Sequence, residues 1–390
     1  MTDPTAHIDP HWPHDAEDAA REQPSLLDVG PVIVTKAMVS EAFDAMRALP
    51  GTGETVTLDT LTRKPRSDKG KPRDVLTLSP SETNTLQTCA RMYWYSYEQG
   101  RRPALADDAA REWGLWVHRS LAQAYRAIRR GLSLDVGIAL ALRQIDRTGT
   151  EGKGRIYTPP AQAHARAMLR AVVRTYLVTW GPGDVANTRV LAVEKRYDLP
   201  ALRADNGSKL VLRQDGVIDL VLASRTSGAV DILDHKTTAS DFEREEYWIG
   251  ADLDPQALSY WDVAGRLGWP PARFLWDMIK KPGLAKTERP LPQESPDAFE
   301  ARMISIILGN PRRYFMRKPI SYQPWQIARH REQTIQLAEE IRWRRRTGAW
   351  PMNRGSCKSF GGCDWIRVCT GEHDLTDDTL YPLKSKEQSK

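Results

Sequence analysis

Two aspartates and a lysine stand inside apolar, strand-like segments of the sequence. Asp219 lies in GVIDLVL (216–222), and Asp234 and Lys236 lie in VDILDHKTT (230–238). Because side chains alternate along a strand, Asp234 and Lys236 point to the same face. Carboxylates on neighbouring strands beside a cation suit a Mg²⁺ or Mn²⁺ site, where the ion takes carboxylates, water and substrate phosphate. Such an ion activates water, and the lysine stabilises charge on phosphorus or positions that water.

The alternative is that Asp219 and Asp234 are ordinary acids of turns or sheet edges. Each of them, however, stands among Val, Ile and Leu. An unpaired carboxylate there would lose its hydration at a cost of several kcal/mol. Because a bound ion removes that cost, the sequence favours the metal site.

Three other polar residues carry weaker signals. His118 lies midway along an expected helix among apolar neighbours, where a histidine is more often a core residue than a ligand. Gln256 and Tyr260 are spaced i, i+4, so they share one helical face. Together they suit a phosphate or a base, but such pairs are common and indicate little alone.

The elements that must position these residues follow from hydrophobic periodicity and capping signals. We expect helices over 79–98, 108–131, 133–147, 160–180, 254–268, 295–309 and 324–347. Segments rich in Val, Ile and Leu and bounded by turns predict strands over 189–199, 209–224, 229–238 and 273–281. Helices followed by a block of strands crossed by helices predict an α/β or α+β core.

In their order along the chain, these motifs resemble the PD-(D/E)XK nuclease superfamily, specifically its RecB-like branch. The matching motifs are Gly114-x-x-x-His118, Gly216-x-x-Asp219, Asp234-His235-Lys236 and Gln256-x-x-x-Tyr260. Any one motif is weak, whereas the ordered set is specific. The resemblance runs from about residue 76 to residue 370 and implies a restriction-endonuclease-like core, a mixed central sheet flanked by helices.

The resemblance also implies roles for individual residues. Metal ligands would be the side chains of His118, Asp219 and Asp234 and the backbone carbonyl of His235. Lys236 would be the catalytic lysine, and Gln256 and Tyr260 would serve DNA contact and active-site support. Glu194 matches an acid often found before the Asp strand and is a secondary candidate.

The four cysteines form one distant residue and a triplet: Cys89, Cys357, Cys363 and Cys369. Four thiolates suit zinc or a [4Fe–4S] cluster, but the close Cys pairs usual in zinc modules are absent. The arrangement is similar to iron–sulfur RecB-like nucleases (AddB domains, the nuclease of CRISPR adaptation and phage relatives), although many of those have a Cys-x2-Cys step. The resemblance therefore implies [4Fe–4S], with Zn²⁺ or independent buried thiols as alternatives. Either metal would staple the C-terminal segment to the first helix in a structural role.

Charge is spread unevenly over the 390 residues. The net charge is +6, but residues 1–28 carry seven acids and one base, so the remainder carries +12. A basic body suits a nucleic-acid partner, and equally serves solubility. Segment 63–73, with six bases and one acid, is a linker or a phosphate-binding arm. We expect a poorly ordered appendage at 1–75, the nuclease domain at 76–370 and a polar tail at 371–390.

Several classes of protein are excluded by the sequence. No apolar stretch reaches the roughly 18–20 residues that span a bilayer. The N-terminus has no signal-like apolar region, and four cysteines are too few for a disulfide scaffold. The expected location is therefore the cytoplasm of a bacterial or phage-infected cell. No P-loop is present, so a helicase or recombination partner would be a separate protein.

The predicted function is a metal-dependent DNA exonuclease in recombination, repair or phage DNA processing. A preference for single-stranded ends follows from tryptophans interleaved with arginines, including Arg329, Arg331 and the segment RWRRR (342–346). The alternatives are a noncatalytic DNA-binding or scaffolding protein that keeps the fold, and a sequence- or structure-specific endonuclease.

Overall fold

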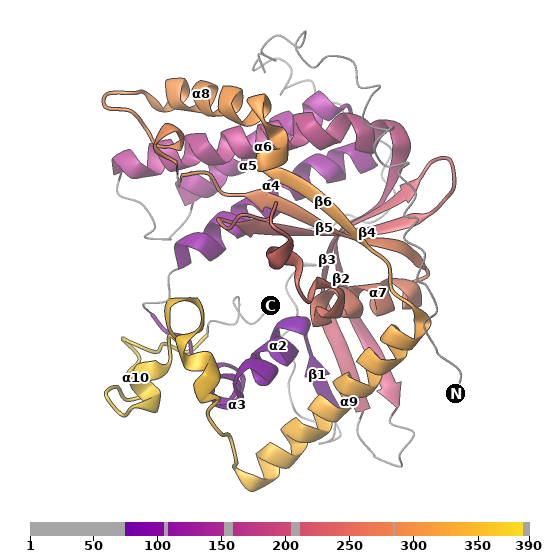
Figure 1. The fold of residues 1–390 in the computed structure, drawn as a ribbon, viewed down its shortest axis with the longest axis vertical. Coiled ribbons are helices and arrows are strands. Elements are labelled where there is room, and N and C mark those ends of the chain that lie inside the picture. Colours follow the sequence, from indigo (N-terminus) through magenta and orange to yellow (C-terminus); the bar gives the residue numbers. More distant parts are fainter. Residues whose placement is uncertain (1–74, 105–107, 152–158, 204–210, 284, 385–390) are drawn as a thin grey trace, which may run out of the picture. The chain divides into compact units, whose positions relative to one another are not determined.

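The computed structural model describes residues 75–104, 108–151, 159–203, 211–283 and 285–384 (Figure 1). All of them belong to the second of the two units into which the chain divides, Gly51–Lys390. The predicted appendage, including the basic segment 63–73, lies outside the described residues except for Val75. No helix in these described ranges is long and apolar enough to cross a membrane.

A six-stranded mixed sheet forms the centre of the fold. Its strands are β1 (Val75–Leu78), β2 (Thr188–Arg203), β3 (Val211–Ser224), β4 (Val230–Thr238), β5 (Pro271–Lys280) and β6 (Phe315–Ile320). The order is β1-β3-β4-β5-β6, and β2 pairs with β3. The β1–β3 and β4–β5 pairs are parallel, and the other pairs are antiparallel. This confirms the predicted mixed central sheet, although β1 and β6 were not predicted.

Helices cover both faces of the sheet (Figure 1). One face carries α4 (Asp108–Arg129), α5 (Leu134–Glu151), α6 (Pro159–Asn187) and α8 (Pro296–Gly309). The other face carries α7 (Pro255–Arg266) and the beginning of α9 (Pro324–Thr347). Short 3₁₀ turns connect these elements: η5 (Glu245–Trp248), η6 (Ala251–Leu253), η7 (Lys286–Glu288) and η8 (Pro311–Arg313).

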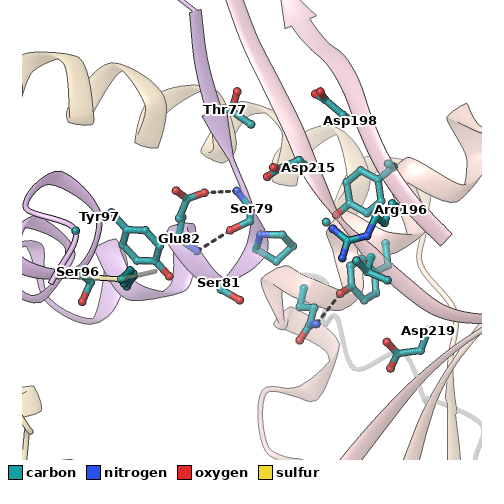
Figure 2. Close-up of a pocket in the computed structure, with 18 of the residues that line it drawn as sticks. Thr77, Ser79, Ser81, Glu82, Ser96, Tyr97, Arg196, Asp198, Asp215 and Asp219 are labelled. Carbon is teal, nitrogen blue, oxygen red and sulfur yellow. Dashed lines mark hydrogen bonds between the residues drawn. The ribbon is translucent and has the colours of Figure 1, made fainter. Parts of the chain in front are cut away.

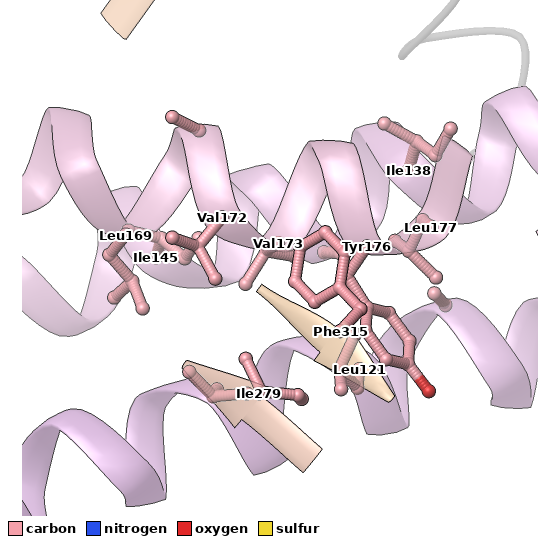
Figure 3. Packing of buried hydrophobic residues seen from close by; sticks show 14 of the residues in the cluster. Leu121, Ile138, Ile145, Leu169, Val172, Val173, Tyr176, Leu177, Ile279 and Phe315 are labelled. Carbon is pink, nitrogen blue, oxygen red and sulfur yellow. The ribbon is translucent and has the colours of Figure 1, made fainter. Parts of the chain in front are cut away.

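The helical face holds a dense apolar core (Figure 3). Leu121 of α4 and Val173 and Tyr176 of α6 are fully buried there, together with Ile279 of β5. Burial of side chains of this size contributes roughly 1.5–3 kcal/mol each. This core fixes α4 against the sheet, which matters because α4 carries His118.

Strand β3 has a gap along the edge that faces β1 and β4. On that edge β1 pairs with Val211–Gln214 and β4 pairs with Leu220–Ala223, while β2 runs along the opposite edge. Among the described residues, no strand is paired with 215–219 on the gapped edge. Asp219 lies at the end of this gap, where β3 and β4 part.

The predicted helix over 79–98 is not continuous. It begins at a capping box between Ser79 and Glu82 as α2 (Pro80–Thr88). Cys89 is then extended, with φ −163° and ψ 117°, and caps α3 (Ala90–Tyr93). A π-helical turn, η4 (Trp94–Glu98), follows. The periodicity of the apolar residues survives this break, which is why the sequence pattern did not reveal it.

Candidate active site

Asp219 lies at the centre of the contacts around the gap in β3. Its Oδ2 accepts a hydrogen bond of 2.9 Å from the backbone N–H of His235 and lies 3.3 Å from Nδ1 of His118. The side chain of His118 reaches this point from α4, while Asp219 and His235 come from β3 and β4. Three elements thus converge on one carboxylate.

Asp234 and Lys236 form an ion pair on the α7 face of β4. Lys236 Nζ lies 2.8 Å from Asp234 Oδ2 and donates to Oε1 of Gln256 at 2.6 Å. The amide of Gln256 donates to Asp234 Oδ1 at 3.3 Å and to the hydroxyl of Tyr260 at 2.9 Å. Of the predicted Gln-x-x-x-Tyr pair, Gln256 therefore contacts the aspartate–lysine pair directly, and Tyr260 is linked to it through Gln256. Asp254 caps α7 by accepting from the N–H of Gln256, which fixes where that side chain begins.

Glu194 completes the group of acids. One ligand atom each from His118, Glu194 and Asp219 lie within 4.8 Å of one another. In the β2–β3 register, Glu194 falls opposite Asp219, between the pairs Val193–Leu220 and Lys195–Ile218. Its φ of 48° is a strained backbone value for a residue with a side chain. The sequence ranked Glu194 only as secondary, and the strain could not be read from the sequence.

Burial sets the ionisation of the carboxylates. Burial and the nearby Asp219 charge raise the pKa of Asp234 although Lys236 opposes this, and burial likewise raises the pKa of Glu194. For Asp219 burial acts in the same direction, but His118 outweighs it and lowers the pKa. Despite its own burial, His118 has its pKa raised to about 9 by Asp219. The group concentrates negative charge that a cation would stabilise.

Lys236 remains an ammonium ion in this setting. Burial alone would lower its pKa, but the Asp234 carboxylate outweighs burial and raises it. A protonated amine serves as a hydrogen-bond donor and a positive charge, and it does not serve as a general base.

The donor group of His118, Glu194 and Asp219 fits a divalent ion with a preference for oxygen, and Asp234 lies outside this group of atoms within 4.8 Å of one another. Asp219 and Asp234 are 8% and 2% exposed, so their charges need a partner. Oδ2 of Asp234 is engaged by Lys236 at 2.8 Å, so an ion bound through this oxygen would share it with the ammonium group. Carboxylates suit Mg²⁺ and Mn²⁺, and the imidazole of His118 moves the set toward Mn²⁺.

A cavity of about 1060 Å³ opens from these residues along the gap in β3 (Figure 2). Asp219, Gln256 and Tyr260 line one end, and Ser96 and Tyr97 of η4 line the other. Gly216, which lines the cavity, lets the hydroxyl of Tyr197 pack close to the β3 backbone, because a Cβ at position 216 would lie 2.5 Å from that hydroxyl. The walls carry charges of both signs: Arg102, Arg196 and Lys384 stand beside the acids Glu82, Asp198, Asp215 and Asp219.

The four cysteines lie in one region: Asn353 contacts Cys89 and Cys357, and Cys363 and Cys369 pack against one aromatic cluster. The thiol pKa values of Cys363 and Cys369 are raised, first by burial and in part by the charges of the other cysteines, Cys89 and Cys357 among them. The backbone N–H of Asn353 lies 3.3 Å from Cys89 Sγ, and the hydroxyl of Tyr95 lies 3.7 Å from Cys369 Sγ. Sulfur atoms with nearby donors suit a thiolate-bound metal group. Over the described ranges, no three of these sulfurs come within 4.8 Å of one another.

The C-terminal segment packs against the first helices. Cys357 lies in η9 (Arg354–Gly361), Cys369 ends α10 (Ile366–Cys369), and Cys363 lies in the loop between them. The side chain of Asn353 donates to the carbonyl of Thr88 at 2.9 Å, and the N–H of Arg91 donates to Pro351 at 3.0 Å. The segment predicted as a polar tail also packs back, since Tyr381 is 3% exposed and stacks on Trp365.

The arginines and tryptophans expected to bind bases are largely used within the fold. Trp113 and Trp350 are buried, whereas Trp343 is 48% exposed. Arg331 pairs with Asp262, Arg344 with Glu340 and Arg345 with Glu98. Thus the motif-flanking aromatic residues mostly serve the core, and α9 is less available to phosphates than its sequence indicated.

Comparison with known proteins agrees with this geometry. The family model of the PD-(D/E)XK nuclease superfamily matches residues 77–370, which is more than half of the chain. The chain therefore belongs to the PD-(D/E)XK nuclease superfamily. A search of curated proteins finds no match to the chain.

Proposed function

We propose that this protein is a metal-dependent DNA exonuclease of the RecB-like branch that prefers single-stranded ends and acts in recombination, repair or phage DNA processing. The observation that carries the proposal is the convergence of Asp219, Asp234 and Lys236 at the point where β3 and β4 part. Nuclease chemistry needs an ion held by acids and a cation beside the scissile phosphate, and these side chains provide both requirements.

Asp219, Asp234, His118 and the backbone carbonyl of His235 would hold the ion, with Glu194 beside them. When bound, Mg²⁺ or Mn²⁺ supplies Lewis acidity toward the phosphate and lowers the pKa of water. His118 must give up its proton to act as a ligand, so ion binding releases a proton. The residues thereby exchange an internal ion pair for a bound cation.

Lys236 would stabilise the negative charge that builds on the phosphate oxygens. Its raised pKa keeps it positive, and Gln256 holds its Nζ at 2.6 Å beside Asp234. A charged donor that is positioned before the reaction loses little free energy to reorganisation in the transition state. Tyr260 supports Gln256 through the 2.9 Å hydrogen bond.

The cavity along the gap in β3 would receive the DNA strand. It begins at Asp219 and ends at Ser96 and Tyr97, with Arg196 on its wall. Tyr97 brings an aromatic ring to this end, with Lys384 4.1 Å from its centroid and the Tyr93 ring at 5.2 Å. Aromatic rings beside cations suit single strands, whose bases are free to stack.

The cysteines would hold a [4Fe–4S] cluster that ties the C-terminal segment to α2 and α3. Support comes from their shared electrostatic environment and from the hydrogen bonds that already join Asn353 to Thr88 and Arg91 to Pro351. The role is structural, because a clip between residues 89 and 357 closes a long loop.

Digestion of end-labelled single-stranded DNA tests the proposal, using wild type, Asp234→Ala and Lys236→Ala with Mg²⁺, Mn²⁺ or EDTA. We expect metal-dependent release of short products by wild type alone. Equal activity in all three proteins contradicts the assignment, and binding without cleavage favours a noncatalytic DNA-binding protein. Cleavage of circular DNA as fast as linear DNA favours an endonuclease.

A further inference from the structure

A chain of buried polar side chains lies behind the active site, on the opposite face of β4 from Asp234 and Lys236. His235 alternates with them along the strand, so its ring points toward α4 and α6. Nδ1 of His235 lies 2.5 Å from Oδ2 of Asp277, its register partner on β5. His235 is 4% exposed and Asp277 is fully buried.

Asp277 is itself held by two other donors. The hydroxyl of Tyr176 donates a short hydrogen bond to Oδ2, and Nε of Arg317 donates to Oδ1 at 3.2 Å. Arg317, on β6, is anchored in turn by two hydrogen bonds to Asp184, of 2.6 and 2.9 Å. Its guanidinium also lies over the Trp180 ring at 4.6 Å. A buried acid with this many partners cannot move without breaking several charge-assisted bonds.

The other side of His235 faces the metal ligands. Its N–H donates to Asp219 at 2.9 Å, beyond Leu233, the last residue of β4 that pairs with β3. In an extended strand the N–H and C=O of one residue point to the same edge. The carbonyl of His235 is therefore directed into the gap beside Asp219, at the place of a metal ligand.

We propose that Asp277, held by Tyr176 and Arg317, is a positioning residue that fixes the His235 ring and thereby the backbone carbonyl offered to the metal. This inference rests on the proposed metal-dependent function. Metal ligands commonly depend on such outer partners, and losing one typically lowers metal affinity or activity about 10–100-fold. Here the proposed ligand is the backbone carbonyl of His235, so Asp277 would position it by holding the side chain of the same residue.

Two buried tyrosines provide a matched test. The hydroxyl of Tyr176 donates to Asp277, and that of Tyr125 donates to Asp184. Both hydroxyls lie within hydrogen-bond distance of Arg317 Nη2, both residues are 0% exposed, and both rings flank His235 at about 6 Å. Each change to Phe keeps the ring and removes one hydroxyl. Only Tyr176→Phe removes a partner of Asp277.

The experiment measures Mn²⁺ affinity by calorimetry, the Mg²⁺ concentration for half-maximal cleavage and the melting temperature. We expect Tyr176→Phe to weaken Mn²⁺ binding several-fold, and Asp277→Asn about tenfold or more. Tyr125→Phe should lower the melting temperature to a similar extent as Tyr176→Phe but keep wild-type affinity. Excess Mg²⁺ should restore the rate of Tyr176→Phe.

The outcomes separate this inference from the proposed function. If the wild-type protein binds Mn²⁺ and the Tyr176→Phe and Tyr125→Phe variants bind it with equal affinity, the positioning role is overturned and the proposed function is not. Absence of Mn²⁺ binding by wild type overturns the proposed function and this inference with it. If Asp277→Asn does not fold, the comparison of the tyrosine variants still decides.

Discussion

Gly114 of α4 approaches Thr237 of β4 so closely that a Cβ at position 114 would lie 2.9 Å from Thr237 Oγ1. Thr237 directly follows the catalytic lysine candidate, and His118 lies one turn of helix after Gly114. The glycine therefore permits the close packing that brings the histidine to the carboxylates. This gives a physical reason for the glycine of the Gly-x-x-x-His motif.

We expect Gly114→Ala to destabilise the fold by about 1–3 kcal/mol, since the added methyl group overlaps a side chain in a packed interface. Gly265→Ala is the matched control: Gly265 is also helical, but a Cβ there meets nothing within 4 Å. The control should gain roughly 0.5–1 kcal/mol from helix propensity. Adding Thr237→Ala should restore part of the loss in Gly114→Ala. Urea unfolding measures all of these, and equal effects of the two glycine changes would rule out the steric explanation.

Substitutions of Lys236 and of Asp234 should affect metal binding and the rate of cleavage differently. Lys236→Ala removes a charge that acts on the phosphate, so we expect the rate to fall about 10²–10³-fold while Mn²⁺ binding persists. Asp234→Ala removes a proposed metal ligand, so this variant should lose both Mn²⁺ binding and cleavage. Calorimetry with Mn²⁺ and single-turnover cleavage provide the two readouts. Loss of Mn²⁺ binding in Lys236→Ala would show that the lysine acts on the site and not on the phosphate.

Gln256 should matter more than Tyr260. Gln256 bonds to a cation, a carboxylate and a hydroxyl, whereas Tyr260 loses one neutral bond on change to Phe. Bonds to charged groups contribute about 1.5–3 kcal/mol each, so Gln256→Ala should reduce kcat about 10–100-fold. Tyr260→Phe should cost less than about tenfold, because a neutral hydrogen bond contributes about 0.5–1.5 kcal/mol. The opposite ranking of kcat values would contradict the assigned roles.

His330 should make stability depend on pH. It is buried on α9 against Ser259, and burial lowers its pKa below 6.5, although Asp262 opposes this. Below pH 6.5 the unfolded chain takes up a proton that folded His330 does not, so stability falls with falling pH. We expect His330→Gln to lose less stability than wild type between pH 7.5 and 5.5, and parallel losses would exclude His330 as the source.

The cysteine assignment predicts a coloured protein. Anaerobically purified wild type should be brown, with a broad shoulder near roughly 400 nm and bound iron. Cys357→Ser and Cys369→Ser should lose this absorption and melt at lower temperature, while Mn²⁺ binding at the carboxylates remains. A colourless protein with stoichiometric zinc would assign the site to Zn²⁺ instead.

Part of the site could be predicted because its two aspartates break a local pattern. Asp219 and Asp234 interrupt apolar strands, and such interruptions indicate function when the acid has no local partner. Asp277 interrupts the apolar run RFLWDMIKK in the same way but was not singled out. Its partner, Arg317, lies on β6, a strand too short and too polar for its sequence to predict. Because β6 was not predicted, the sequence did not reveal Arg317 as the partner of Asp277.

Other features depend on contacts between distant segments. Glu194 has a strained φ although its neighbours Val193 and Lys195 pair regularly with β3, and no local sequence signal reports this strain. The break at Cys89 follows from its role beside the C-terminal segment, where Asn353 bonds to both Thr88 and Cys89. The pairing of Arg331 with Asp262 likewise joins two helices. Charge counts along one helix could not show which arginines are already neutralised.

The most direct test of the central claim is a crystal soaked in Mn²⁺ and measured for anomalous scattering. The account predicts one strong peak, or two adjacent peaks, within bonding distance of Asp219 and Asp234, with His118 or Glu194 alongside. An ordered site with intact side chains and no peak, or a peak only elsewhere on the molecule, would contradict it.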